Sequence, residues 1–308
     1  MPPSPAIESI GYLGPAGTHS HQAVLALSQD SRARAVFSGA SLQPYPTLYA
    51  LLEAVDAQAV AVALLPVENS LQGAVVESME AVGLDRFSLN VHLECLLPIQ
   101  HALIRQPQAA AADALNDTTT LAGLTGVMSH PQALAQCRET LRALLGPDVT
   151  LEPTASTADA VRQLALRDAA WAALGSREAA RLHAMRVVRE DVSDSPDNVT
   201  RFWLASSTRQ TLRLPVWPDL PVKTSLCIGL QDRPGALMEI LLGLKAYDLN
   251  MSRIESRPSR RRLGEYLFYV DVDGDLRDPR LERIVMFMEA DKTYFRMTSA
   301  YPCLGALR

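Results

Sequence analysis

The sequence predicts an α/β body followed by a smaller tail with a ferredoxin-like order of elements. Three observations lead to this prediction. Strand-like and helix-like patterns alternate over residues 1–205, as they do in folds built around mostly parallel sheets. A polar stretch with several prolines follows at residues 206–222. The remaining chain reads as βαββαβ, which is the order of a ferredoxin-like unit.

The elements of the body are short and close together. We expect strands at residues 7–13 and 60–65, near 127 and 149, and at 170–174, with a β-rich stretch at 87–104. We expect helices at 19–28 and 47–57, after Gly73, from Pro131 and from Thr157. Residues 60–65 are apolar on both faces, which is typical of a buried parallel strand.

Residues 206–222 are expected to form a semi-rigid linker, because proline neither donates to a sheet nor continues a helix. In the tail we expect strands at 225–230, 251–257, 265–272 and 294–299, and helices at 235–247 and around Leu281. Apolar residues recur at helical spacing in both helices. They would cover one face of a four-stranded antiparallel sheet and leave the other face free for a partner.

Composition and charge exclude several classes of protein. Hydrophobic residues make up 48% of the chain and charged residues 20%, enough for more than one core. The net charge of −5 gives no indication of a nucleic-acid partner. We find no signal peptide, no apolar window long enough for a membrane span and four widely separated cysteines, so we expect a cytoplasmic protein without disulfides.

Small polar residues follow several strands of the body, where helices begin. They are Thr18, Ser20, Asn69, Ser70, Gln132, Ser156 and Thr157. Each alone is an ordinary helix cap or turn. Together they lie at the carboxyl ends of predicted parallel strands, where ligands bind in open α/β sheets. Helix N-termini at that edge favour a small anionic ligand.

Other chemistries find little support in the sequence. The histidines and cysteines show no zinc-binding spacing, and there is no G-x-S-x-G elbow. We therefore expect no metal and no cofactor. The segment 197–204 leads from a polar turn into a strand, and residue type alone favours a plain strand residue at Thr200 and a surface charge at Arg201.

An ordered series of segments resembles the prephenate dehydratases, which are enzymes of phenylalanine biosynthesis. In the body these segments are Gly14-Pro-Ala-Gly-Thr-His-Ser20, Pro66-Val-Glu-Asn-Ser70, Ser129-His-Pro-Gln132, Ser156-Thr-Ala158 and Asn198-Val-Thr-Arg-Phe202. Two segments of the tail, Gly235-Ala-Leu-Met238 and Glu255-Ser-Arg-Pro258, resemble the phenylalanine-binding motifs of that family's ACT domain. The resemblance covers residues 8–300.

The resemblance implies a two-lobed catalytic body like a periplasmic binding protein at 1–205, the linker at 206–222 and an ACT regulatory domain at 223–308. The site would lie in the cleft between the lobes. We expect the chain to cross to the second lobe near 79–87 and to return near 187. Some relatives carry a chorismate mutase segment before the body, and we expect that activity to be absent here.

The resemblance also implies the reaction and its catalytic residues, Thr200, Arg201 and Phe202. Prephenate would lose CO2 and its ring hydroxyl to give phenylpyruvate, and the aromatic ring that forms drives the step. We expect Arg201 to contact a substrate carboxylate and Thr200 to hydrogen-bond to the departing hydroxyl. Glu68 and His101 are further candidate proton sources. A regular strand would place Thr200 and Arg201 on opposite faces, which this assignment leaves unexplained.

In the tail, the resemblance implies a regulatory site for L-phenylalanine. Its candidate residues are Gly235, Ala236, Leu237, Met238, Asn250, Glu255, Ser256, Arg257 and Pro258. ACT domains commonly pair, so we expect a homodimer or homotetramer. Two alternatives remain open: arogenate in place of prephenate as the substrate, and an inert amino-acid sensor in place of an enzyme.

Overall fold

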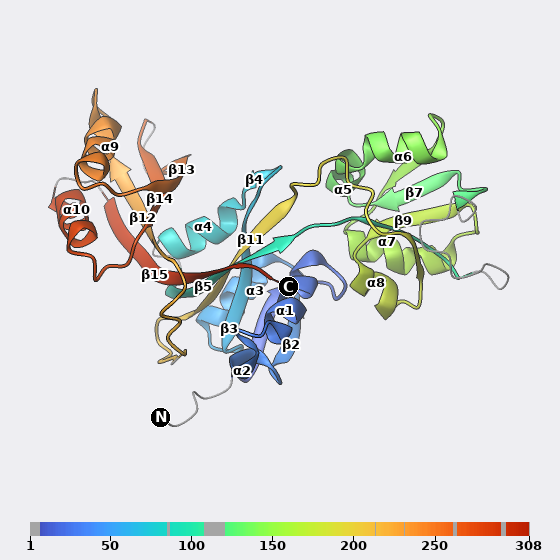
Figure 1. Ribbon diagram of the computed structural model, residues 1–308, viewed down its shortest axis with the longest axis horizontal. Helices are drawn as coiled ribbons and strands as arrows, with labels where there is room; N and C mark the ends of the chain where they lie inside the picture. The colour runs from blue at the N-terminus through green and yellow to red at the C-terminus, as the bar shows by residue number, and fades with distance from the viewer. Residues whose placement is uncertain are drawn as a thin grey trace.

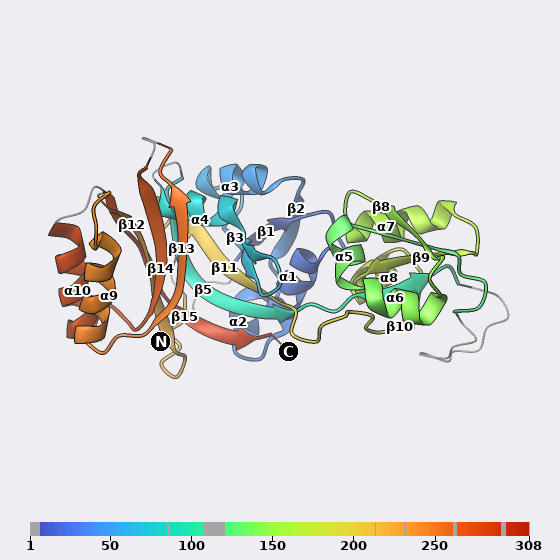
Figure 2. The same ribbon diagram turned by 90° about the horizontal axis from the view of Figure 1, so that it is seen from above.

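The computed structural model describes residues 7–84, 87–107, 121–212, 214–230, 232–260, 264–290 and 294–307. The elements form three units in a row: the tail at one end, the first lobe in the middle and the second lobe at the other end (Figure 1). The view from above shows the same row (Figure 2). Among the described helices, none is long and apolar enough to cross a membrane.

The first lobe is built on a mixed sheet with the strand order β5-β11-β3-β1-β2. Its strands are β1 (Ser9–Leu13), β2 (Ser41–Tyr45), β3 (Val62–Asn69), β4 (Gly73–Ala74), β5 (Leu89–Pro98) and β11 (Val199–Ser207). Its helices are α1 (His19–Gln29), α2 (Arg34–Phe37), α3 (Leu48–Asp56) and α4 (Val76–Gly83). As the apolar run predicted, β3 is buried on both faces from Val62 to Val67.

The second lobe is a separate sheet with the order β10-β6-β9-β7-β8. Its elements are β6 (Ala102–Arg105), β7 (Gly126–Ser129), α5 (Pro131–Gln136), α6 (Arg138–Leu145), β8 (Thr150–Pro153), α7 (Thr157–Gln163), η2 (Leu164–Leu166), β9 (Trp171–Gly175), α8 (Arg177–Leu182) and β10 (Arg186–Arg189). One face of the sheet packs on Leu141 of α6, the other on Val161 of α7. The α/β prediction for the body is confirmed, but the sheets are mixed and not mostly parallel, because β11 pairs antiparallel with β3 and β5, and β6 pairs antiparallel with β9 and β10.

The chain crosses between the lobes at two places (Figure 1). The first crossing joins β5 to β6 at Ile99–His101, and the expectation of a crossing near 79–87 is wrong. Residues 79–83 belong to α4, which stays with the first lobe. The return runs through residues 190–198 between β10 and β11, slightly later than expected. These two crossing segments connect the lobes, and we refer to them together as the hinge. They leave room for a cleft between the lobes.

The tail confirms the predicted βαββαβ order. Its elements are β12 (Val222–Leu230), α9 (Ala236–Ala246), β13 (Met251–Pro258), β14 (Tyr266–Asp273), α10 (Pro279–Ala290) and β15 (Tyr294–Ala306). The strands are ordered β13-β14-β12-β15 and pair antiparallel. Ile240 of α9 and Ile284 of α10 pack on Ile228 of β12, which places both helices on one face of the sheet.

The sequence suggested that the opposite face of the tail sheet is free, and this expectation is wrong. Helix α4 of the first lobe packs against that face (Figure 1). Met79 and Val82 of α4 share one apolar cluster with Cys227 and Tyr269 of the tail. A Cβ at Gly83 would lie 2.4 Å from the Tyr269 ring, so the close approach of the helix requires glycine. The tail is therefore docked on the body.

Strand β15 also joins the tail sheet to the sheet of the first lobe. Residues 294–302 pair with β12 in the tail, and the strand then runs on beside β5 of the first lobe, where Cys303 lies opposite Glu94. The last residues of the expected regulatory domain thus belong to the sheet of the body. The expected linker is anchored to the body at Trp217, which contacts the first-lobe core and donates from Nε1 to the Arg32 carbonyl at 3.0 Å.

Candidate functional site

A cleft of about 420 Å³ lies between the two lobes. It is lined by Leu13, Gly14, Thr18, His19, Ser20, Pro46, Pro66, Asn69, Gln72, Val75, Ile99, His101, His130, Gln132, Ala133, Gln136, Ala155, Ser156, Thr157, Asn198, Thr200 and Phe202. The first lobe, the second lobe and both crossing segments contribute to this lining. None of these described lining residues is Lys, Arg, Asp or Glu, so neutral donors and backbone N–H groups would have to bind an anion here.

The start of α1 brings the first polar group to the cleft. Thr18 is its N-cap, and Thr18 Oγ1 accepts from the backbone N–H of His21 at 3.3 Å. Ser20 follows in the first turn and lines the same cleft. The N-terminal turn of a helix leaves backbone N–H groups unpaired and carries a partial positive charge. This end of α1 therefore favours a carboxylate.

The second lobe supplies neutral donors from the opposite wall. Ser156 caps α7 by accepting from the backbone N–H of Asp159 at 3.0 Å, and Thr157 is the next residue. In α5, Pro131 occupies the first turn and His130 is the cap, accepting at Nδ1 from Gln132 N–H at 3.3 Å. The side chains of two lobes thus face one cleft, as the resemblance implied.

Asn69 makes the Thr200 hydroxyl a hydrogen-bond acceptor. Asn69 Oδ1 accepts from the backbone N–H groups of Leu71 and Gln72 at 3.1 and 3.2 Å, so its Nδ2 must be the donor on the other side. That Nδ2 lies 3.0 Å from Thr200 Oγ1. Because Thr200 accepts this hydrogen bond, its own hydroxyl proton remains available for donation into the cleft.

The hydrogen bonds continue in the same donor-to-acceptor direction from Asn69 through the crossing segments to the second lobe. Asn69 Nδ2 also donates to Asn198 Oδ1 at 2.7 Å, and Asn198 Nδ2 donates to Gln136 Oε1 at 3.1 Å. His101 Nε2 lies 2.9 Å from that same oxygen and must therefore carry a proton. A neutral His101 is then left with a lone pair on Nδ1, a buried atom with no partner among the described residues.

Two of the three histidines on the cleft wall, His19 and His101, are neutral at pH 7. Burial lowers the pKa of His19 to about 4, and His101 beside it acts in the same direction. Burial also lowers the pKa of His101, against the opposing effect of the hydrogen bond with Gln136. The two rings meet edge to face, with centroids 5.2 Å apart. His101 can accept a hydrogen bond at Nδ1, but it has no proton to release there.

The sequence placed three further residues at the site that the structure places elsewhere. Ser70 does not line the cleft: its Oγ donates to the Asp197 carbonyl at 2.6 Å and accepts from Val199 N–H at 2.9 Å, which fixes the start of β11. Arg201 and Glu68 point to the tail. The expectation that Arg201 contacts a substrate carboxylate does not fit this geometry, because strand alternation turns it away from the cleft that Thr200 and Phe202 line.

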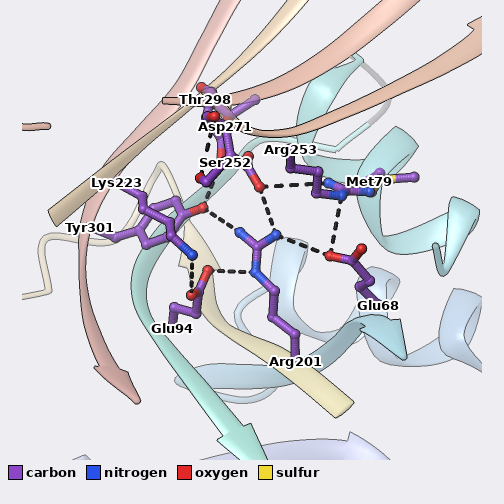
Figure 3. Close-up of polar contacts among 11 residues, drawn as sticks. Glu68, Met79, Glu94, Arg201, Lys223, Ser252, Arg253, Asp271, Thr298 and Tyr301 are labelled. Carbon is purple, nitrogen blue, oxygen red and sulfur yellow. Dashed lines mark hydrogen bonds and ion pairs between the residues drawn. The ribbon is translucent and has the colours of Figure 1, made fainter. Parts of the chain in front are cut away.

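Arg201 instead occupies a buried polar cluster between body and tail (Figure 3). Its Nε donates to Glu94 at 2.5 Å, its Nη1 to Asp271 at 2.6 Å and its Nη2 to the Tyr301 hydroxyl at 3.0 Å. Burial alone would lower the pKa of Arg201, but Asp271, Tyr301 and Glu94 outweigh it and raise the pKa. The guanidinium is therefore charged at every pH of interest.

The candidate effector residues of the tail lie in two groups. Gly235, at φ 84°, is the N-cap of α9, and Ala236, Leu237 and Met238 form its first turn. Glu255, Ser256, Arg257 and Pro258 end β13, and Glu255 pairs with Arg257 at 2.7 Å. Asn250 donates from Nδ2 to Asp273 at 2.6 Å. A pocket of about 370 Å³ at the end of α9 includes Asn250, whereas the other candidates lie outside it.

Sequence reasoning missed several residues that line the cleft. His19 and Asn198 were noticed only as members of motifs, and Gln136 was not singled out. Their contacts depend on the hinge: Asn198 is 62 residues from Gln136 and 129 from Asn69 in the chain. The buried position of Asn198, 1% exposed, is the signal of its role, and it is visible only in the fold.

Comparisons with known proteins identify the family of this chain. The family model of prephenate dehydratase matches residues 10–210. A prephenate dehydratase of Methanocaldococcus jannaschii is 33% identical and spans 83% of this chain and 86% of its own length. The chloroplastic arogenate dehydratase/prephenate dehydratase 2 of Arabidopsis thaliana is 31% identical over 92% of this chain and 76% of its own length.

Among solved structures, the crystal structure of prephenate dehydratase from Arthrobacter aurescens in complex with L-Phe superposes with a TM-score of 0.79. It is 32% identical, and the match covers 96% of this chain and 89% of that one. The matched region includes both lobes and the tail. The chain belongs to the prephenate dehydratase family.

Proposed function

We propose that the chain converts prephenate to phenylpyruvate, CO2 and water in the cleft between its lobes, a lyase reaction. The observation that carries the proposal is that the Thr200 hydroxyl lines the cleft and accepts a hydrogen bond from Asn69, which leaves its own proton available for donation to a substrate. Family membership supports the same reaction. An inert sensor would have no need of a hydroxyl held in this way.

Binding of the two substrate carboxylates is assigned to opposite walls. The start of α1, with Thr18 and Ser20, takes one carboxylate, and Gln132, Ser156 and Thr157 of the second lobe take the other. Because the walls belong to different lobes, a dianion that bridges them holds the cleft in one geometry. Neutral donors suit this task, since a carboxylate that accepts hydrogen bonds needs no opposite charge beside it.

Thr200 is assigned to the departing hydroxyl. The bond between the ring carbon and the carboxylate breaks, its electron pair enters the ring, and the hydroxyl on the opposite ring carbon leaves as hydroxide, which takes up a proton from the solvent and is released as water. Hydroxide departs poorly without help, so a hydrogen bond that strengthens as the C–O bond breaks lowers the barrier. Thr200 is a weak acid and acts as a donor, and the ring that becomes aromatic supplies the driving force without a cofactor.

The tail is assigned to regulation by L-phenylalanine. The relative from Arthrobacter aurescens is described in complex with L-Phe, and the tail here carries two segments that resemble the phenylalanine-binding motifs of an ACT domain. Strand β13 ends the order of the continuous sheet, and Ile254 on it is 39% exposed. An exposed edge strand pairs readily with a second copy, so we assign the chain to a homodimer or homotetramer with the effector bound between tails.

The test is an assay of the purified chain with prephenate. Formation of phenylpyruvate, detected by its absorbance, is the expected result, and unchanged prephenate would overturn the proposal. Arogenate is assayed beside it, because a relative of 31% identity is named for both substrates. Formation of phenylalanine from arogenate at a higher kcat/KM would replace prephenate as the substrate and leave the chemistry of Thr200 in place.

A further inference from the structure

Two neighbouring cross-strand pairs connect the cleft to the tail. In the ladder between β3 and β11, Asn69 lies opposite Thr200, and Glu68 lies opposite Arg201. Successive residues of a strand point to opposite faces. The Asn69–Thr200 pair therefore faces the cleft. The Glu68–Arg201 pair lies on the opposite face of the two strands and points to the tail (Figure 3).

Both members of the rear pair are held by the tail. Asp271 of β14 binds Arg201 at 2.6 Å, and Arg253 of β13 binds Glu68 at 3.3 Å. The side chains of Arg201, Asp271 and Arg253 are 9%, 2% and 7% exposed. Water screens the Arg201–Asp271 pair only weakly, whereas the Glu68 side chain is 37% exposed and its pair with Arg253 is partly screened. The tail thus contacts both strands directly behind the residues that carry the proposed chemistry.

The charges on the two sides are complementary. Across the junction, the body contributes two anions and one cation, and the tail two cations and one anion: Glu68, Glu94 and Arg201 against Lys223, Arg253 and Asp271. The body thus has one anion more than it has cations, and the tail has one cation more than it has anions. Lys223 of the tail binds Glu94 of the body at 3.0 Å, so these charges are paired across the junction. The junction is thus a matched docking surface, and a shift of the tail must move the charges to which β3 and β11 are tied.

Asp271 is held in a closed ring of hydrogen bonds. Ser225 donates to Asp271 Oδ1 at 2.5 Å, Tyr301 lies 2.6 Å from Ser225 Oγ, and Arg201 donates to both Tyr301 and Asp271. This ring uses both carboxylate oxygens of Asp271. Arg201 therefore has one defined position for a given position of the tail sheet.

Arg253 links this junction to the candidate effector site. It lies on β13 between Asn250 and Glu255, and on the half-buried side of the strand together with Glu255 and Arg257. An amino acid bound along β13 would contact the strand that carries Arg253, and it could therefore shift this side chain. The other end of this side chain reaches Glu68, the residue before Asn69.

We propose that Asp271 and Arg253 are positioning residues through which the tail sets the spacing of Asn69 and Thr200. The inference rests on the proposed dehydratase activity and its regulation by phenylalanine, and it names the path between the two sites. With the junction intact, the Thr200 hydroxyl is aligned for donation. When the tail shifts, the Glu68–Arg201 pair shifts with it and the alignment is lost.

The main test is the variant Asp271→Asn in the full chain, with kcat, KM and inhibition by phenylalanine measured. A misplaced donor lowers kcat by about 10- to 100-fold while KM changes little, because the donors of the cleft are untouched. The ratio of activities without and with phenylalanine should fall towards one. The matched control is Asp275→Asn, which removes the same charge from an exposed pair with Arg277 in the tail.

A milder variant guards against misfolding of Asp271→Asn. Ser225→Ala keeps all six charges and removes only the hydroxyl that fixes Asp271, so it should show the same split between kcat and KM, with a smaller change. Wild-type kcat and phenylalanine response in both Ser225→Ala and a folded Asp271→Asn would overturn this inference alone. A wild-type chain without activity on either substrate would overturn the proposed function, and the inference with it.

Discussion

At the residue scale, the direction of one hydrogen bond decides what Thr200 can do. The backbone N–H groups of Leu71 and Gln72 hold Asn69 Oδ1, so the amide nitrogen faces Thr200. A carboxylate at position 69 would keep the turn but present an acceptor to Thr200. The hydroxyl would then donate to residue 69 and no longer to the substrate.

Asn69→Asp is therefore expected to lower kcat by about 10²–10⁴, the range for the loss of a positioned proton donor or acceptor. Steady-state kinetics with prephenate measure the effect. Asn90→Asp is the matched control, because Asn90 is an exposed residue of β5 and the change adds the same charge. An Asn69→Asp enzyme as fast as this control would show that the orientation of the Thr200 hydroxyl does not matter.

Buried histidines make the folded state sensitive to acid. Burial lowers the pKa of His92 to about 4, and its Nε2 lies 2.7 Å from Ser206 Oγ. Between that value and the usual pKa of about 6.5 the unfolded chain binds more protons than the folded one. The free energy of unfolding must therefore fall as the pH decreases from about 6.5 to 4, by up to about 1.4 kcal/mol per pH unit for each such histidine.

Urea denaturation of the wild type and His92→Gln at several pH values measures this contribution. The variant should lose less stability than the wild type between pH 6.5 and 4, with the remaining slope due to groups such as His19. Above pH 6.5 both histidines are neutral in either state, and the two curves should run parallel. Equal slopes throughout would mean that His92 is not held neutral by the fold.

The sequence also set a limit on what could be predicted for single residues. Strand alternation predicted Thr200 and Arg201 on opposite faces, and the structure has them so. The partners of Arg201 could not be predicted, because Glu94 and Asp271 lie 107 and 70 residues away in the chain. A local pattern shows that a charge is turned to the other face, but it does not show what covers that face.

At the scale of elements, strands with a clear apolar pattern were predicted. A strand that contains proline was missed, and a strand that changes its partner was predicted too short. Strand β2 was missed because it contains Pro44, which is tolerated only at a sheet edge such as the one it occupies. The expected last strand ended at residue 299, whereas β15 runs to Ala306 and changes partner from β12 to β5. Hydrophobic alternation predicts that a segment is a strand, but it does not indicate which sheet the strand joins.

Gly235 allows a prediction at the start of α9. Its φ of 84° is costly for residues with a Cβ, by about 1–2 kcal/mol. No described atom lies within 4 Å of the position that a Cβ would take, so Gly235→Val should strain the backbone without a clash. We expect activity without effector to be retained and binding of phenylalanine to be weakened, as measured by calorimetry on the full chain.

Gly146→Val is the control for backbone strain. Gly146 ends α6 in the second lobe at φ 95°, and it too has open space where a Cβ would lie. This variant should lose at least as much stability, because φ 95° with ψ 169° is a conformation that is essentially restricted to glycine, and it should keep its affinity for phenylalanine. If both variants bind phenylalanine like the wild type, the first turn of α9 is not part of the effector site.

At the scale of the whole molecule, the protein is two lobes and a tail joined by a shared strand and a buried polar junction. The described residues contain no group of three or more His, Cys, Asp or Glu that could hold a metal ion. The proposed chemistry uses neutral donors and the formation of an aromatic ring. We expect dehydratase activity to survive exhaustive chelation by EDTA. Loss of activity that a divalent ion restores would require a different mechanism.

The measurement that tests the account most directly is the rate of phenylpyruvate formation from prephenate by the wild type, Thr200→Ser and Thr200→Ala. The account predicts that serine, which keeps a hydroxyl, retains much of the wild-type kcat. Alanine should lower kcat by about 10²–10⁴ with little change in KM, because the carboxylate-binding groups remain. A folded Thr200→Ala enzyme with near-normal kcat would contradict the role of Thr200 and, with it, the mechanism proposed for the cleft.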